Sequence, residues 1–76
     1  MKAHEAIRMA MNLGILCRPI EPGWSGSALQ PTETMFHKYS PGYSGHLWPS
    51  PAQLVKDWEL TTLEKIRKEY DAPIGF

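Results

Sequence analysis

The chain has 76 residues, a length that corresponds to one small domain. Its 8 basic and 8 acidic side chains cancel, so it lacks the excess positive charge with which DNA- and RNA-binding proteins neutralise phosphates. No apolar run approaches the roughly 20 residues that span a bilayer. We therefore expect a single domain over residues 1–76 that binds neither nucleic acid nor membrane.

Cys17 is the only cysteine, which excludes a disulfide within the chain. The three histidines do not form with it the short ligand spacings of a zinc site, so no metal or other cofactor is expected. A domain of this size buries only about 60% of its unfolded surface, and self-association is a common remedy; we expect a homo-oligomer. A lone thiol and an N-terminal segment without signal-peptide character favour a cytoplasmic location.

The N-terminal segment has the pattern of an amphipathic helix over residues 3–13. Its apolar residues recur at the spacing of one buried helix face, namely Ala3, Ala6, Ile7, Ala10 and Met11. Gly14 follows and is suited to end the helix in the left-handed conformation. This segment is therefore predicted to pack as a helix against the rest of the domain.

Residues 15–18 are short, apolar and followed by a proline, a pattern that predicts a strand ending early or lying at a sheet edge. Alternation places Ile15 and Cys17 on one face and Leu16 and Arg18 on the other. Arg18 is accordingly expected to be an exposed strand residue.

Three further segments are rich in turn-forming residues. Residues 21–27 form a loop in which Trp24 lies between glycines, and glycines allow the backbone to approach a ligand closely. Residues 28–30 and 34–39 are predicted to form a hairpin, and residues 40–44 a second loop.

The stretch from Gly45 to Leu60 reads GHLWPSPAQLVKDWEL and combines several local patterns. Trp48 precedes a proline and is therefore biased towards extended backbone. Residues 50–53 have the pattern of a capped helix start, with serine as cap, proline at the first helical position and glutamine reaching back. The sequence predicts a short helix here, followed by a strand over residues 58–61.

Residues 61–64 form a second capping pattern that begins a final helix. Leu63, Ile66 and Tyr70 give this helix one apolar stripe, and residues 71–76 are expected to be a tail. The order of elements predicts an α+β domain: a small antiparallel sheet flanked by an N-terminal helix, a short helix before the last strand and a C-terminal helix.

Five short motifs occur in an order found in a known family. They are Gly14, Arg18, Trp24-Ser25-Gly26, Trp48-Pro49-Ser50 and Asp57-Trp58-Glu59. Over residues 3–61 the chain thus resembles the Thoeris anti-defence protein two family of phage and bacterial proteins. The resemblance implies dimers or tetramers with ligand pockets at subunit interfaces. It also implies sequestration, without cleavage, of cyclic nucleotide-type immune signals, chiefly glycosyl-cyclic ADP-ribose, in an infected bacterial cell.

The resemblance also implies roles for individual residues. Trp24 would stack on a base, Asp57 would accept from a ribose hydroxyl or base amino group, and Arg18 would pair with a phosphate. His46, close to the Trp48 motif, is a further candidate to donate to a phosphate. Each also has a structural reading, with Trp24 closing the core and Asp57 pairing at a helix end. Trp48 and Trp58 are expected in the core.

We therefore expect a non-enzymatic, oligomeric protein that binds and sequesters glycosyl-cyclic ADP-ribose or a cyclic oligonucleotide. Such ligands require an aromatic platform, an acceptor and a cation, and stacking contributes about 1–3 kcal/mol per base. One alternative is a protein-binding inhibitor that uses exposed Trp24, Tyr39 and Tyr43. Another is a hydrolase of the same signals, in which Cys17 and a histidine would form a catalytic pair.

Overall fold

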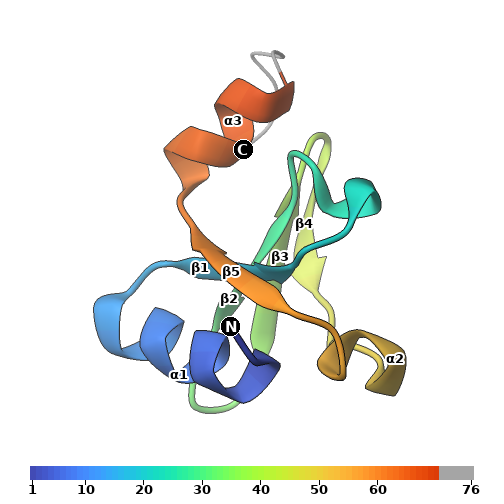
Figure 1. The fold of residues 1–76 in the computed structure, drawn as a ribbon. Helices are drawn as coiled ribbons and strands as arrows, with labels where there is room; N and C mark the ends of the chain where they lie inside the picture. The colour runs from blue at the N-terminus through green and yellow to red at the C-terminus, as the bar shows by residue number, and fades with distance from the viewer. Residues whose placement is uncertain (71–76) are drawn as a thin grey trace.

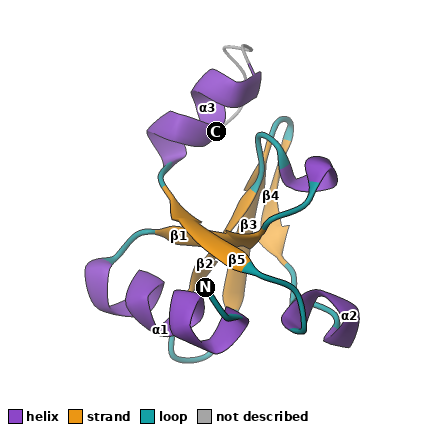
Figure 2. Cartoon of the chain, in the orientation of Figure 1, coloured by secondary structure: helices purple, strands orange, loops and turns teal. Residues whose placement is uncertain are grey.

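A computed structural model describes residues 1–70; the expected tail at residues 71–76 lies outside the described residues. The elements follow in the order α1 (Ala3–Leu13), β1 (Leu16–Pro19), a 3₁₀ turn η1 (Pro22–Trp24), β2 (Ala28–Pro31), β3 (Phe36–Ser40), β4 (Tyr43–His46), α2 (Pro51–Leu54), β5 (Trp58–Thr61) and α3 (Leu63–Tyr70). Helices lie on both sides of one sheet (Figures 1 and 2), which confirms the predicted α+β class.

The five strands lie in the order β4-β3-β2-β1-β5, and every neighbouring pair is antiparallel. Cys17 lies at the centre of one cross-strand row, opposite Leu29 on β2 and Leu60 on β5. The predicted strand at residues 15–18 is displaced by one residue. The predicted alternation holds, because Cys17 and Leu16 belong to separate hydrophobic clusters on the two faces.

Helix α1 covers the face of the sheet that carries Cys17, Leu29 and Trp58, all of which are buried. The helix contacts the sheet through the small residues Ala3, Ala6 and Ala10. Gly14 ends the helix with a φ of 67°, as predicted. Met11, expected on the same buried face, is instead 40% exposed.

Helix α3 lies on the other side of the sheet (Figure 1). Its Ile66 is fully buried against Leu16 and Ala28, so the helix covers the β1 and β2 part of this face. The Thr62 hydroxyl accepts from the Lys65 N–H at 3.2 Å, which confirms a capped start close to the predicted one.

Helix α2 forms as predicted. The Gln53 N–H donates to the Ser50 hydroxyl at 3.3 Å, and the Ser50 N–H donates to the Gln53 side-chain oxygen at 2.8 Å. These reciprocal bonds satisfy two backbone donors at the helix start. The Trp58 indole N–H then donates to the Gln53 carbonyl at 2.9 Å, which ties the short helix to the core.

Strand β4 was not predicted, since residues 40–44 were assigned to a loop. A tight turn with Gly42 at a φ of 71° instead joins β3 and β4. Ser40 pairs with Tyr43 and His37 with His46 across the resulting hairpin. Trp48 also departs from its prediction: it is 64% exposed, and its ring makes an edge-to-face contact with Phe36. The core therefore contains Trp58 and Trp24 but not Trp48.

Candidate functional site

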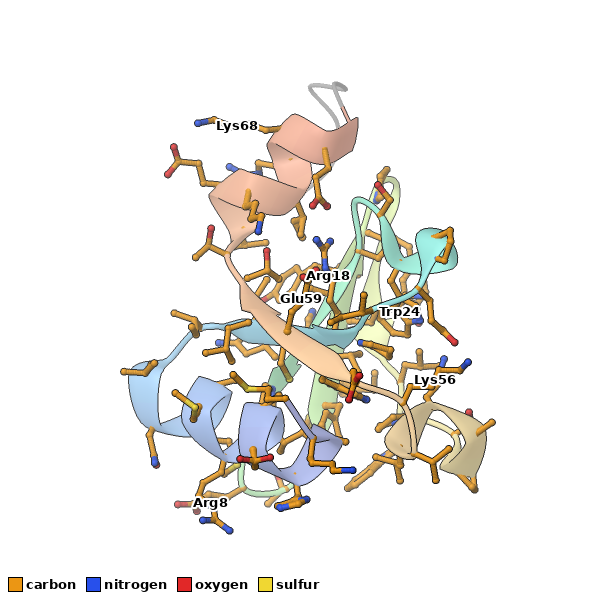
Figure 3. The ribbon with its side chains drawn as sticks, viewed as in Figure 1. Arg8, Arg18, Trp24, Lys56, Glu59 and Lys68 are labelled. Atoms are coloured by element: carbon orange, nitrogen blue, oxygen red, sulfur yellow. The ribbon has the colours of Figure 1, made fainter. Side chains whose placement is uncertain are left out.

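Arg18 is buried, in contrast to the exposed position expected for it. Its Nε donates to Glu59 at 2.7 Å, and the two terminal nitrogens donate to the two carboxylate oxygens of Glu69. The same guanidinium donates to the carbonyls of Trp24 and Ser27 at 3.2 and 3.3 Å. Figure 3 shows Arg18 beside Glu59 at the middle of the sheet. Arg18 therefore joins β5, α3 and the loop after β1.

The cleft beside Arg18 is acidic overall. It has a volume of about 290 Å³ and is lined by Arg18, Ile20, Glu21, Pro22, Ser25, Glu59 and Glu69. Hydrogen bonds from Arg18, and further from the Gly26 N–H, lower the pKa of Glu69 to about 2, so this carboxyl is ionised at neutral pH. The guanidinium is already paired with Glu59 and Glu69, and Glu21, which also lines the cleft, is paired with Lys56, so a phosphate is disfavoured here. The role of Arg18 as a phosphate partner thus has no support in this geometry.

Trp24 is 6% exposed and belongs to the core cluster beneath α1. Lys38 Nζ lies 4.9 Å from the centre of its ring, a cation–π contact worth about 0.5–1 kcal/mol at such sites. The ring therefore has no open face for a base in this conformation. Trp24 therefore occupies the position expected of a ring that closes the small core.

Asp57 lies at the exposed corner between α2 and β5. Its backbone pairs with Lys2, and its carbonyl accepts from the Ile20 N–H at 2.9 Å. Next to it, Lys56 forms an ion pair with Glu21 at 3.1 Å. The Asp57 carboxylate has no hydrogen bond or ion pair with any residue in 1–70, so it is available to a ligand or a second chain.

His46 lies in the open, on the face of the sheet opposite α1, and faces His37 on the adjacent strand. The Leu47 N–H donates to the Phe36 carbonyl at 3.2 Å, which makes His37 and His46 a non-hydrogen-bonded pair, the type with the closer side chains. Their ring centres are 5.7 Å apart. His46 is thus the predicted site residue that the structure places among other candidate ligand groups.

These groups form a continuous surface on β2, β3 and β4. The register places on one face the side chains of Gln30, His37, Tyr39, Ser44 and His46, which we call the histidine face. His37 Nε2 lies 2.6 Å from the Ser44 hydroxyl, its ring centre is 4.6 Å from that of Tyr39, and the Tyr39 hydroxyl donates to Gln30 at 3.1 Å. The face combines rings, donors and acceptors and includes no carboxylate.

A second cleft continues from the histidine face towards α3. It has a volume of about 180 Å³ and is lined by Gly14, Ile15, Leu16, Gln30, Tyr39, Thr62 and Leu63. Its walls are mostly apolar, with the Gln30 amide and two hydroxyl groups as the polar exceptions.

Cys17 lies at the centre of the sheet and is fully buried. Burial raises the pKa of its thiol to about 12, so the thiolate needed for nucleophilic attack is not formed at neutral pH. This position gives no support to the catalytic pair considered for a hydrolase.

Sequence reasoning missed most of the histidine face and the whole of the Arg18 network. Gln30, His37 and Ser44 are brought to one face by the pairing of β3 with β2 and β4, which the sequence did not predict for β4. A Pro-Gly turn between Tyr39 and Tyr43 was the signal that could have predicted this hairpin. Nothing local could have paired Arg18 with Glu69, since 51 residues separate them.

Within residues 1–70, no three histidine, cysteine or acidic side chains are grouped to hold a metal ion. No helix in this part of the chain is long and apolar enough to cross a bilayer. Comparisons with protein-family models, curated proteins and solved structures found no match to this chain.

Proposed function

We propose that this chain binds a cyclic nucleotide-type signal, such as glycosyl-cyclic ADP-ribose or a cyclic oligonucleotide, and sequesters it without cleavage. Two lines of support lead to this proposal. The first is the order of sequence motifs that resembles the Thoeris anti-defence protein two family. The second is the histidine face, and this surface is the observation on which the proposal rests.

The histidine face offers what each part of a nucleotide requires. The exposed ring of His46, with the half-buried rings of His37 and Tyr39 beside it, provides a surface on which a base can stack. Gln30 and Ser44 provide an amide and a hydroxyl for ribose or base edges. Imidazole N–H groups can donate to phosphate oxygens.

Electrostatics favours this face over the cleft at Arg18. The Arg18 cleft contains Glu21, Glu59 and Glu69, which would repel a phosphate. The histidine face has no carboxylate, and the adjoining cleft is lined by apolar and neutral polar residues. A ligand with a flat base and anionic phosphates is therefore better matched to the second surface.

The proposal predicts that His46→Ala weakens nucleotide binding by about tenfold to a hundredfold, the equivalent of about 1–3 kcal/mol for one stacked or hydrogen-bonded group. His46 is exposed, so the melting temperature should stay within about 2 °C. His4→Ala is the matched control, because His4 is an exposed histidine on α1. Isothermal titration calorimetry against cyclic ADP-ribose isomers and cyclic dinucleotides measures the affinity of each of the two variants, and a thermal melt gives their melting temperatures. Equal affinities for the two variants would remove His46 from the site.

The fate of the ligand separates sequestration from hydrolysis. After uptake, heating the protein should release the ligand with its mass and chromatographic retention unchanged. Recovery of linear nucleotide or ADP-ribose fragments would contradict the proposal and favour a hydrolase.

A second candidate function, protein binding, is favoured by one observation. Trp48, Leu54 and Val55 are 64%, 44% and 85% exposed within one short segment around α2. Exposed apolar groups of this kind are typical of protein-interaction surfaces, and tryptophan is prominent among binding hot spots. A Trp48→Ala chain that keeps full nucleotide affinity would show that any role of this surface is separate from the ligand site.

A further inference from the structure

The two edges of the sheet differ in their protection. At the β5 edge, the Trp58 N–H donates to the Met1 carbonyl at 2.7 Å, and Lys2 pairs with Asp57. At the other edge, no segment in residues 1–70 pairs with the outer side of β4. The β4 sequence, Tyr-Ser-Gly-His, also lacks the lysine, proline or bulge with which proteins usually block an open edge. Strand β4 is therefore open to pairing.

The register identifies the groups that an added strand would meet. The pairs of the β3–β4 ladder alternate between two types. Lys38–Gly45 and Ser40–Tyr43 are hydrogen-bonded pairs, whereas His37–His46 and Tyr39–Ser44 are non-hydrogen-bonded pairs. In an antiparallel ladder, residues of the non-hydrogen-bonded pairs direct their N–H and C=O groups away from their partner strand. The backbone groups of Ser44 and His46 therefore point outwards from the sheet.

We propose that a second copy of this chain pairs with β4 in antiparallel register, with Gly45 opposite Gly45 of the partner subunit. In this register, Ser44 and the partner's His46 exchange both of their free backbone hydrogen bonds, and the reverse pair does the same. The two five-stranded sheets then form one continuous sheet.

The side chains of the same segment are complementary in this register. Tyr43 and Leu47 are 47% and 37% exposed, and both lie on the face of the sheet that carries Gly45. The pairing places Tyr43 opposite the partner's Leu47, and the reverse, so that each apolar side chain acquires a cross-strand neighbour.

Competing two-fold registers are less favourable. Centring the pair on Ser44 would require Gly42 to join the ladder, but its φ of 71° takes it out of extended conformation. Centring it on His46 would place two imidazoles directly opposite each other and would remove the contact between Tyr43 and the partner's Leu47. At Gly45 the close approach of two backbones meets no Cβ.

The pairing also joins the two histidine faces, because Ser44 and His46 of both copies lie on the same side of the continuous sheet. His37 and His46 of one copy would be followed directly by Ser44 and Tyr39 of the partner subunit. The interface itself requires no ligand. An experiment that contradicts the interface therefore leaves the proposed nucleotide binding untouched, and the reverse also holds.

A proline substitution tests the interface. Ser44→Pro removes an outward N–H that the β3–β4 ladder does not use, while Ser44→Ala removes only the hydroxyl and is the matched control. We expect wild type and Ser44→Ala to have a mass of at least twice the 8.6 kDa of one chain by analytical ultracentrifugation, and Ser44→Pro to halve that mass. Circular dichroism and a cooperative melt establish that each variant is folded. A monomeric wild type, or a folded Ser44→Pro variant with undiminished mass, would overturn the proposal.

Cysteine cross-linking tests the register and does not depend on the proline variant. Non-hydrogen-bonded pairs hold their Cα atoms about 4.5 Å apart, within the range of a disulfide. Chains carrying Tyr43→Cys and differently tagged chains carrying Leu47→Cys, once co-expressed and oxidised, should give a mixed disulfide dimer. Neither variant alone should cross-link, and the wild type with its buried Cys17 is the background control. Cross-linking within a single variant, or none in the mixture, would contradict the Gly45-centred register.

Discussion

Replacing Trp58 with alanine is expected to lower the free energy of unfolding by about 3–5 kcal/mol, the range for large buried aromatic side chains. Trp58 is 1% exposed and packs between α1 and the sheet. Its indole N–H donates to the Gln53 carbonyl, so the substitution also frees α2 from the core. Domains of this size have a total stability of roughly 4–11 kcal/mol, so the expected loss is a large fraction of the total.

Urea unfolding followed by circular dichroism measures this loss. Trp48→Ala is the matched control, since Trp48 is the same residue type but is 64% exposed. Its expected loss is less than about 1 kcal/mol. Equal losses in the two variants would contradict the placement of Trp58 inside the core and Trp48 outside it.

Removing Arg18 is expected to have the second largest effect. Arg18→Ala leaves two half-buried carboxylates, Glu59 on β5 and Glu69 near the end of α3, without their shared cation. Removing one partner of a fully buried ion pair costs about 3–5 kcal/mol, and we expect a loss towards the lower end of this range. Under the earlier expectation of an exposed phosphate partner, the same variant would lose ligand affinity alone. A variant with wild-type stability would show that the ion pairs contribute nothing to the fold.

The Arg18–Glu69 pair also predicts a pH dependence. Arg18 lowers the pKa of Glu69 from 4.5 to about 2, so the folded state binds the Glu69 proton less readily than the unfolded state does. The resulting stabilisation is complete above about pH 4.5 and is lost as the pH falls towards 2.

Glu69→Gln should therefore be less stable than wild type at pH 7, and the two should converge as the pH falls through this window. Urea unfolding at pH 7, 4.5, 3 and 2 measures the difference. Glu64→Gln is the matched control, because Glu64 lies on the same helix in an exposed pair with Lys68. If the wild-type and Glu69→Gln curves stay parallel down to pH 2, the ion pair does not stabilise the folded state.

The elements that could be predicted from the sequence are those with local causes. Helix α1 has the predicted bounds because its small apolar residues recur with helical spacing and Gly14 permits a positive φ. Helix α2 begins as predicted because Ser50 and Gln53 cap each other within four residues. Strand β4 was missed because Tyr43 to His46 carry no alternating apolar pattern, and most of them are exposed.

The candidate site could be predicted only in part, since burial depends on contacts between distant segments. Trp24 looked like a ligand-binding residue because glycines surround it, but packing within the core cluster buries it. Arg18 looked exposed because its partner on α3 lies 51 residues further along the chain. His46 was identified by its proximity to the Trp48 motif, whereas its neighbours on the histidine face depended on the register of β3 and β4.

The measurement that tests the proposed function most directly is a thermal-shift screen of the wild-type chain against cyclic ADP-ribose isomers and cyclic di- and trinucleotides. A ligand at a hundred times its dissociation constant stabilises the folded state by about 2.7 kcal/mol, which corresponds to a rise in melting temperature of roughly 10 °C or more for a domain of this size. We expect one class of these ligands to give such a rise and the others none. A cooperatively melting protein that responds to none of them would contradict nucleotide sequestration and favour protein binding at the exposed Trp48 surface.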